Sequence, residues 1–139
     1  MGFSLYGHEL SEEITPLEAR LAWALSLDKA EDFIGKEALL EQQRSKDFRR
    51  LRGFIMLDKG IPRQGYEVLN AGDEMIGMVS SGTHSPSLQR GIGLAFLAPD
   101  SARLGQVINI AVRGRQLKAE LVKLPFVPSH IKKSNTAKI

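Results

Sequence analysis

The sequence contains no cysteine among its 139 residues. This absence excludes a disulfide framework, a thiolate nucleophile and a zinc ribbon. It is also consistent with a reducing compartment. The histidines, at positions 8, 84 and 130, do not have the spacing of metal ligands, so no metal site is expected.

Long apolar runs are also missing. No stretch approaches the roughly 20 apolar residues that a membrane-spanning helix needs. The first residues, MGFSLYGHELSEE, do not place a basic segment before an apolar one, so they do not form a signal peptide. We therefore expect a cytoplasmic protein with no membrane partner.

Aromatic residues are few, at 6% of the chain, and no nucleic-acid-binding motif is present. The formal net charge is +3, and the basic excess is concentrated in KDFRRLR at 46–52 and in the tail at 130–139. Solvated surface charge is the commoner meaning of such short runs. We therefore predict no nucleic-acid partner.

The second part of the sequence has the pattern of a small antiparallel β-structure. Short apolar or alternating stretches, separated by turn residues, occupy 51–57, 66–70, 75–81, 90–97, 106–112 and 116–124. The last two stretches flank Arg113-Gly114 and predict a hairpin, and Asn70-Ala71-Gly72-Asp73 predicts another turn. This regular spacing indicates a barrel or sandwich.

The first 46 residues have a different, αβ-like texture and are too short to bury a core alone. Thr15-Pro16-Leu17-Glu18 predicts a helix start or a tight turn. Residues 21–27 (LAWALSL) predict a short buried strand or a helix, and residues 32–43 predict a helix.

The loop SSGTHSPSL, at 80–88, is rich in hydroxyl groups and has three alternative interpretations. A phosphate cradle requires a helix after the loop, whereas a strand-like run follows here. A serine nucleophile requires a neighbouring base, and the proximity of His84 in sequence is weak support. The favoured interpretation is turn chemistry at a crossing between strands, where Pro86 interrupts pairing.

Trp23 is the single tryptophan. A tryptophan within an apolar run is most often part of the core, and the alternative is an aromatic wall for a planar ligand. Glu18 lies shortly before it, and electrostatics at a helix start explain that carboxylate.

Several motifs together resemble the C-terminal portion of the glycine cleavage system T-protein family, the aminomethyltransferases. The resemblance covers nearly the whole chain up to Val127. It rests on LYGHELSEEITPLEARLAWALSLDK (5–29), DFIGKEAL (32–39), RRLRGFIMLDKGIPRQGYEVLN (49–70), IGMVSSGTHSPSLQRGIGLAFL (76–97) and PFV (125–127).

The resemblance implies a fold class that is mostly β, with an α+β N-terminal segment and a small six-stranded antiparallel β-barrel or jelly-roll-like domain. Residues 1–46 would be the end of the folate-binding core domain, 47–127 the barrel domain, and 128–139 a polar tail.

The resemblance also implies a reaction. The family transfers the methylene of an aminomethyl group, carried on the lipoyl arm of the H-protein, to tetrahydrofolate and releases ammonia. Tetrahydrofolate would be the cosubstrate, and the lipoylated H-protein and the N-terminal domains of the same enzyme would be the partners. The family's catalytic carboxylate belongs to those N-terminal domains, so we expect a fragment with negligible turnover alone.

Two folate-binding residues follow from the resemblance. Trp23 matches the tryptophan that borders the family's folate pocket. The residue through which the family's barrel reaches folate falls near Ile131 or Lys132, and Lys132 is the candidate, although the family has Tyr or Arg there. No catalytic residue and no metal ligand are assigned.

Three alternatives remain open. The chain is a stand-alone β-barrel module that docks a partner through Arg49, Arg50 and Arg52, or a fragment of a related folate-dependent demethylase, or a remnant whose first 46 residues are poorly ordered.

Overall fold

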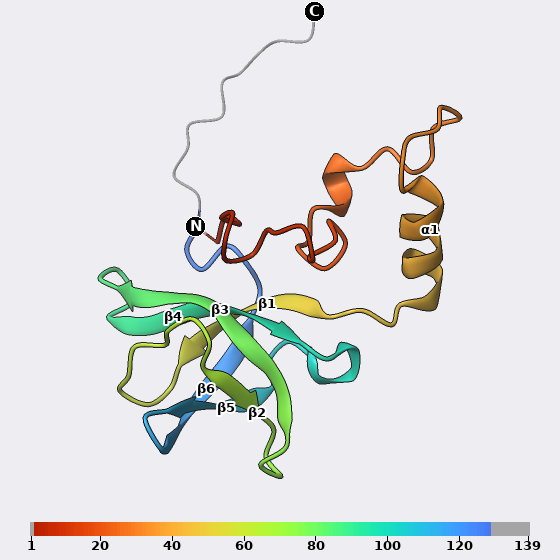
Figure 1. The fold of residues 1–139 in the computed structure, drawn as a ribbon. Coiled ribbons are helices and arrows are strands. Elements are labelled where there is room, and N and C mark those ends of the chain that lie inside the picture. The colour runs from red at the N-terminus through yellow and green to blue at the C-terminus, as the bar shows by residue number, and fades with distance from the viewer. Residues whose placement is uncertain (1, 129–139) are drawn as a thin grey trace, which may run out of the picture.

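Six antiparallel strands form a closed barrel in the computed structural model, which describes residues 2–128 (Figure 1). The strands follow one another around the barrel in the order β1-β4-β3-β2-β5-β6. The predicted six-stranded barrel is confirmed. Its strands are β1 (Arg50–Met56), β2 (Glu67–Leu69), β3 (Met75–Ser85), β4 (Arg90–Leu97), β5 (Val107–Val112) and β6 (Arg115–Val122).

The interior of the barrel is filled by apolar side chains from all six strands. Phe54 is fully buried at its centre and packs in a cluster with Met56, Val68 and Ile110. Gly93, which lies opposite Phe54 in the pairing of β1 with β4, leaves room for that ring. A Cβ atom on Gly93 would lie 2.5 Å from the Phe54 ring. The barrel therefore depends on small residues of β4 as well as on large residues of β1.

The hairpins follow the turn chemistry of the sequence. Between β5 and β6, Arg113 and Gly114 both have positive φ, as a two-residue hairpin turn requires. Between β2 and β3, the Oδ1 atom of Asn70 accepts hydrogen bonds from the backbone N–H groups of Gly72 and Glu74. In that turn the positive φ belongs to Asp73, not to the glycine.

The first part of the chain contains little regular structure. Residues 15–20 form a tight turn, and the predicted helix over 32–43 is α1 (Lys36–Ser45). Residues 21–27 differ from the prediction of a buried element. They contain only a single 3₁₀ turn, η1 (Ala22–Ala24), with no buried residue. A second 3₁₀ turn, η2 (Pro99–Ser101), precedes β5.

The N-terminal segment lies on the outer face of the barrel, beside β1 and β4 (Figure 1). There Leu51, Leu94 and Phe96 form a second apolar cluster, against which Ile14 and Leu124 pack. The helix α1 stands to one side of the barrel and buries none of its residues. Residues 5–18 are thus joined to the barrel, whereas α1 makes no core contact.

Within residues 2–128, no helix combines the length and the hydropathy that crossing a membrane demands. The same part of the chain contains no cluster of His, Asp and Glu side chains suited to a metal ion.

Candidate functional site

A cleft of about 440 Å³ opens between the N-terminal segment and the outer face of the barrel, and Trp23 borders it. Its walls come from distant parts of the chain. It is lined by residues 2–4 and 19–21, Trp23, Leu51, Leu124 and Pro125. Trp23 therefore lies beside a cavity. It is not part of the core, since 82% of its surface is exposed. The interpretation of Trp23 as a core residue is wrong.

The lining of this cleft, which we call the Trp23 cleft, is apolar with a basic border. Phe3, Leu21 and Leu51 supply apolar surface, and no Asp or Glu belongs to its lining within the described residues. Among residues 2–128, Arg20 is the one charged residue in the lining. The arrangement suits a planar ring stacked on an indole, with an anionic group near a guanidinium.

A second arginine, Arg52, does not line this cleft, but its charge interacts with that of Arg20. Burial lowers the pKa of Arg52 from its ordinary value, and the like charges of Arg20 and Arg50 lower it further. The Nε atom of Arg52 donates a hydrogen bond to the carbonyl oxygen of Ala102 at 2.9 Å, which fixes the side chain. Arg20 therefore has a second positive charge in its electrostatic neighbourhood.

Glu18 holds the turn that leads into the Trp23 cleft. Its Oε2 atom accepts a hydrogen bond from the Thr15 N–H at 2.9 Å, and its Oε1 atom accepts one from Nε of Arg49 at 2.8 Å. Burial raises the pKa of Glu18, but the bonds from Arg49 and Thr15 lower it more, so the net shift is downward. The contact with Thr15 accounts for only one of the two side-chain contacts of Glu18. The other partner, Arg49, is distant in the sequence, so spacing does not reveal it.

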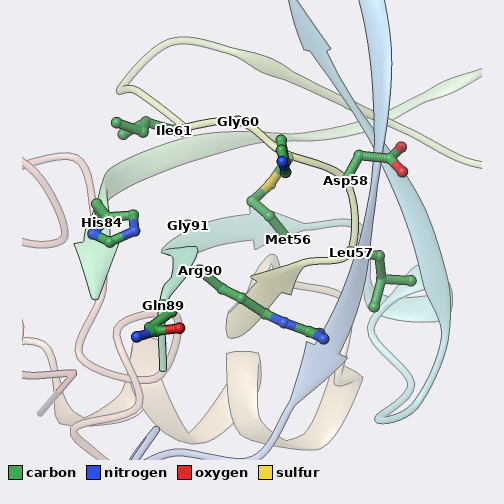
Figure 2. Close-up of a pocket in the computed structure, with 10 residues that line it drawn as sticks. Met56, Leu57, Asp58, Gly60, Ile61, His84, Gln89, Arg90 and Gly91 are labelled. Atoms are coloured by element: carbon green, nitrogen blue, oxygen red, sulfur yellow. The ribbon is translucent and has the colours of Figure 1, made fainter. Parts of the chain in front are cut away.

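Another cavity, of about 480 Å³, lies where β1 ends and β4 begins (Figure 2). His84 lies on one side of it and Leu57 and Asp58 on the other. Basic side chains of Lys59, His84 and Arg90 line it, and in the part of the chain that the structure describes no ring of Phe, Tyr or Trp does. The Trp23 cleft is therefore the better site for a planar ligand.

The hydroxyl-rich loop at 80–88 lies mostly within the hairpin that β3 and β4 form. Strand β3 continues through Ser85, and the chain turns back before β4 begins at Arg90. The Oγ atom of Ser85 accepts a hydrogen bond from the Leu88 N–H at 3.3 Å, which is ordinary turn chemistry. No helix follows the loop, so the feature that a phosphate cradle requires is missing.

The three arginines of the proposed basic docking face have partners within the chain. Arg49 bonds to Glu18, the guanidinium of Arg50 lies 3.7 Å from the centroid of the Phe48 ring, and Arg52 bonds to Ala102. Docking through these residues would compete with their internal contacts. Lys132, the other candidate folate contact, lies outside the described residues.

These features define a closed antiparallel barrel with an apolar cleft under the N-terminal segment at residues 2–34, which we call the N-terminal arm. The family model described as "Glycine cleavage T-protein C-terminal barrel domain" matches residues 49–128. The chain belongs to this family.

Similar proteins support this membership. The chain is 48% identical over 129 residues to an aminomethyltransferase of Alkaliphilus metalliredigens, covering 93% of this chain and 35% of that protein. It is 45% identical over 126 residues to an aminomethyltransferase of Bacteroides thetaiotaomicron, covering 91% of this chain and again 35% of the relative. The chain thus spans about a third of the length of these curated relatives.

A solved structure has the same fold. The crystal structure of glycine cleavage system aminomethyltransferase T from Bartonella henselae superimposes with a TM-score of 0.83 and 26% sequence identity. The match covers 91% of this chain and 36% of that one, so it includes the N-terminal arm as well as the barrel.

Proposed function

We propose that this chain is the C-terminal portion of a tetrahydrofolate-dependent aminomethyltransferase of the glycine cleavage system, acting in the cytoplasm. The complete enzyme would transfer the methylene of the aminomethyl group on the lipoylated H-protein to tetrahydrofolate and release ammonia. The names of the relatives support the reaction class. The observation that carries the proposal is the exposed indole of Trp23 beside an apolar cleft.

Trp23 would bind the pteridine ring of tetrahydrofolate by stacking, since an indole offers a broad flat face. Leu21 and Leu51 would contact the same ring from the sides of the cleft. Arg20 would pair with a carboxylate of the glutamyl end, because a guanidinium recognises carboxylates well. Lys132 stays a second proposed folate contact.

The chain alone would bind its cosubstrate without turning it over. Proton transfer during release of ammonia requires a positioned acid or base. The lining of the Trp23 cleft contains no carboxylate within residues 2–128. The catalytic carboxylate would come from the part of the enzyme that corresponds to the other two thirds of the relatives.

The exposed apolar side chains of the N-terminal arm would contact that other part of the enzyme. Half of the large apolar side chains that are exposed in the described structure come from residues 3–34. They are Phe3, Leu5, Tyr6, Trp23, Phe33 and Ile34. Large exposed apolar patches mark protein interfaces, and these side chains would contribute to one.

An ammonia-release assay tests the proposal. The substrate is H-protein loaded with the aminomethyl group, supplied with tetrahydrofolate. We expect no release above background with this chain alone, and release when a polypeptide corresponding to the remaining N-terminal part of a relative is added. Turnover by the chain alone, or no turnover by the mixture although the two polypeptides associate, would contradict the proposal.

A further inference from the structure

Two glutamates of the N-terminal arm are buried although neither lines the Trp23 cleft. The relative solvent exposure of Glu9 is 1%, and that of Glu18 is 7%. Burying a carboxylate is costly unless hydrogen bonds compensate for the lost water. The proposed reaction assigns neither side chain a role, so their hydrogen-bond partners indicate what each one does.

Glu9 joins the start of the arm to β3. Its Oε1 atom accepts a hydrogen bond from the Ser80 hydroxyl at 2.7 Å, and its Oε2 atom accepts one from the backbone N–H of Leu5 at 3.1 Å. Beside this pair, Nδ1 of His8 lies 3.1 Å from the carbonyl oxygen of Ser80. One carboxylate therefore fixes its own chain segment and attaches that segment to the barrel.

Glu18 repeats this arrangement further along the arm. It accepts one hydrogen bond from its own segment, at Thr15, and one from the barrel side, at Arg49. The backbone adds a third connection, because the Leu51 N–H donates to the carbonyl oxygen of Glu18 at 3.3 Å. Both glutamates thus contact the local backbone with one oxygen and a distant residue with the other.

The positions of the two glutamates match the two walls that the arm gives to the Trp23 cleft. One wall, residues 2–4, directly precedes Leu5, whose N–H is held by Glu9. The other wall, residues 19–21 and Trp23, directly follows Glu18. We propose that Glu9, through Ser80, and Glu18, through Arg49, are positioning residues that hold these two walls on the barrel and so shape the cleft. The identity of the ligand rests on the proposed function, whereas the positioning role does not.

Hydrogen exchange in the full chain measures the positioning role directly. Glu9→Gln retains the size of the side chain but turns one acceptor oxygen into a donor group that faces Leu5 N–H or Ser80. Ser80→Ala removes the partner hydroxyl. Losing a buried hydrogen bond to a charged group corresponds to roughly 10–100-fold faster local opening. We expect that acceleration at the amides of residues 3–10 in both variants.

Glu13→Gln is the matched control, because Glu13 is exposed and the substitution removes the same charge. It should leave exchange unchanged. The amides of β5 and β6, far along the chain from the arm, report whether the barrel remains folded. Unchanged exchange at residues 3–10 in a folded Glu9→Gln variant would overturn the proposal.

Calorimetric titration with tetrahydrofolate then separates this proposal from the proposed function. We expect roughly 10-fold weaker binding in Glu9→Gln and Ser80→Ala, and similar weakening in Glu18→Gln. Faster exchange with unchanged affinity would overturn the link between the glutamates and the cleft. If the unmodified chain does not bind tetrahydrofolate, the folate assignment fails. In that case hydrogen exchange at the amides of residues 3–4 and 19–24 is the only test of the positioning role. Faster exchange in the variants supports the role, and unchanged exchange contradicts it.

Discussion

The Nε atom of Arg49 lies 2.8 Å from Oε1 of Glu18, and this ion pair joins the entrance of β1 to the turn at residues 15–20. Residues 18 and 49 are far apart in the sequence, so the pair is a tertiary contact. The guanidinium of Arg49 also lies 5.3 Å from the centroid of the Phe96 ring. The pair therefore connects the arm, β1 and β4 at one point.

The stability of the protein should depend on pH through Glu18. Its pKa in the folded protein is below the ordinary value of 4.5, so folding favours the charged carboxylate. The stabilisation is present above pH 4.5 and is lost as the pH falls through the lower folded pKa. We expect Glu18→Gln to reduce the free energy of unfolding by about 1–3 kcal/mol at pH 7.

The same measurement at a pH below the folded pKa of Glu18 is the internal control, because both proteins then have a neutral side chain at this position. The difference in urea-unfolding free energy should shrink there. A difference that stays constant from pH 3 to pH 7 would show that the charge of Glu18 does not contribute.

The core of the barrel should be sensitive to truncation at Phe54. This side chain is fully buried, with 0% exposure, so Phe54→Ala should cost about 3–5 kcal/mol in unfolding free energy. Phe33→Ala is the matched control, since Phe33 is 40% exposed in the arm, and it should change stability by less than about 1 kcal/mol. Equal losses in the two variants would contradict the placement of the core.

Gly77 should not tolerate a methyl group. A Cβ atom there would lie 2.1 Å from the carbonyl oxygen of Phe96, on the neighbouring strand β4. Backbone cannot move aside as a flexible side chain can, so Gly77→Ala should cost about 1–3 kcal/mol. Thermal unfolding measures this loss. Gly72→Ala is the control, because its Cβ would meet only Asn70 Oδ1, at 3.4 Å. A stable Gly77→Ala protein would contradict the close approach of β3 and β4.

In the unmodified protein, Arg20 should lower the stability of the fold while contributing to ligand binding. Its φ of 62° lies in the left-handed region, and its charge acts unfavourably on Arg52. Arg20→Gly should therefore raise the free energy of unfolding by about 0.5–1 kcal/mol, because glycine adopts positive φ without steric cost. It should also weaken tetrahydrofolate binding. Lower stability in this variant, measured by denaturant unfolding, would contradict the strain at this position.

The barrel could be predicted from the sequence because its signals are local. Alternating apolar residues mark each strand, and pairs such as Arg113-Gly114 mark the hairpins that join them. Local signals also predicted α1, although the helix begins at Lys36 and not at Asp32. Closure into a barrel depends on the pairing of β1 with β6, which local pattern does not reveal.

The surroundings of the cleft were harder to predict. An apolar run usually indicates burial, yet residues 21–27 lie on the surface and expose Trp23. Periodicity cannot distinguish a core segment from one that borders a ligand site or an interface. Glu9 had no signal at all in composition or spacing, because its partner Ser80 lies 71 residues away.

Calorimetric titration of tetrahydrofolate into the unmodified chain and into Trp23→Ala shows whether the Trp23 cleft holds the pteridine ring. Trp23 is exposed, so its removal should change stability by less than about 1 kcal/mol and leave the barrel folded. We expect saturable binding by the unmodified chain, at least roughly 10-fold weaker binding by Trp23→Ala, and unchanged binding by Phe33→Ala. Equal affinity in the Trp23→Ala variant and the unmodified chain would contradict binding of the ring in this cleft.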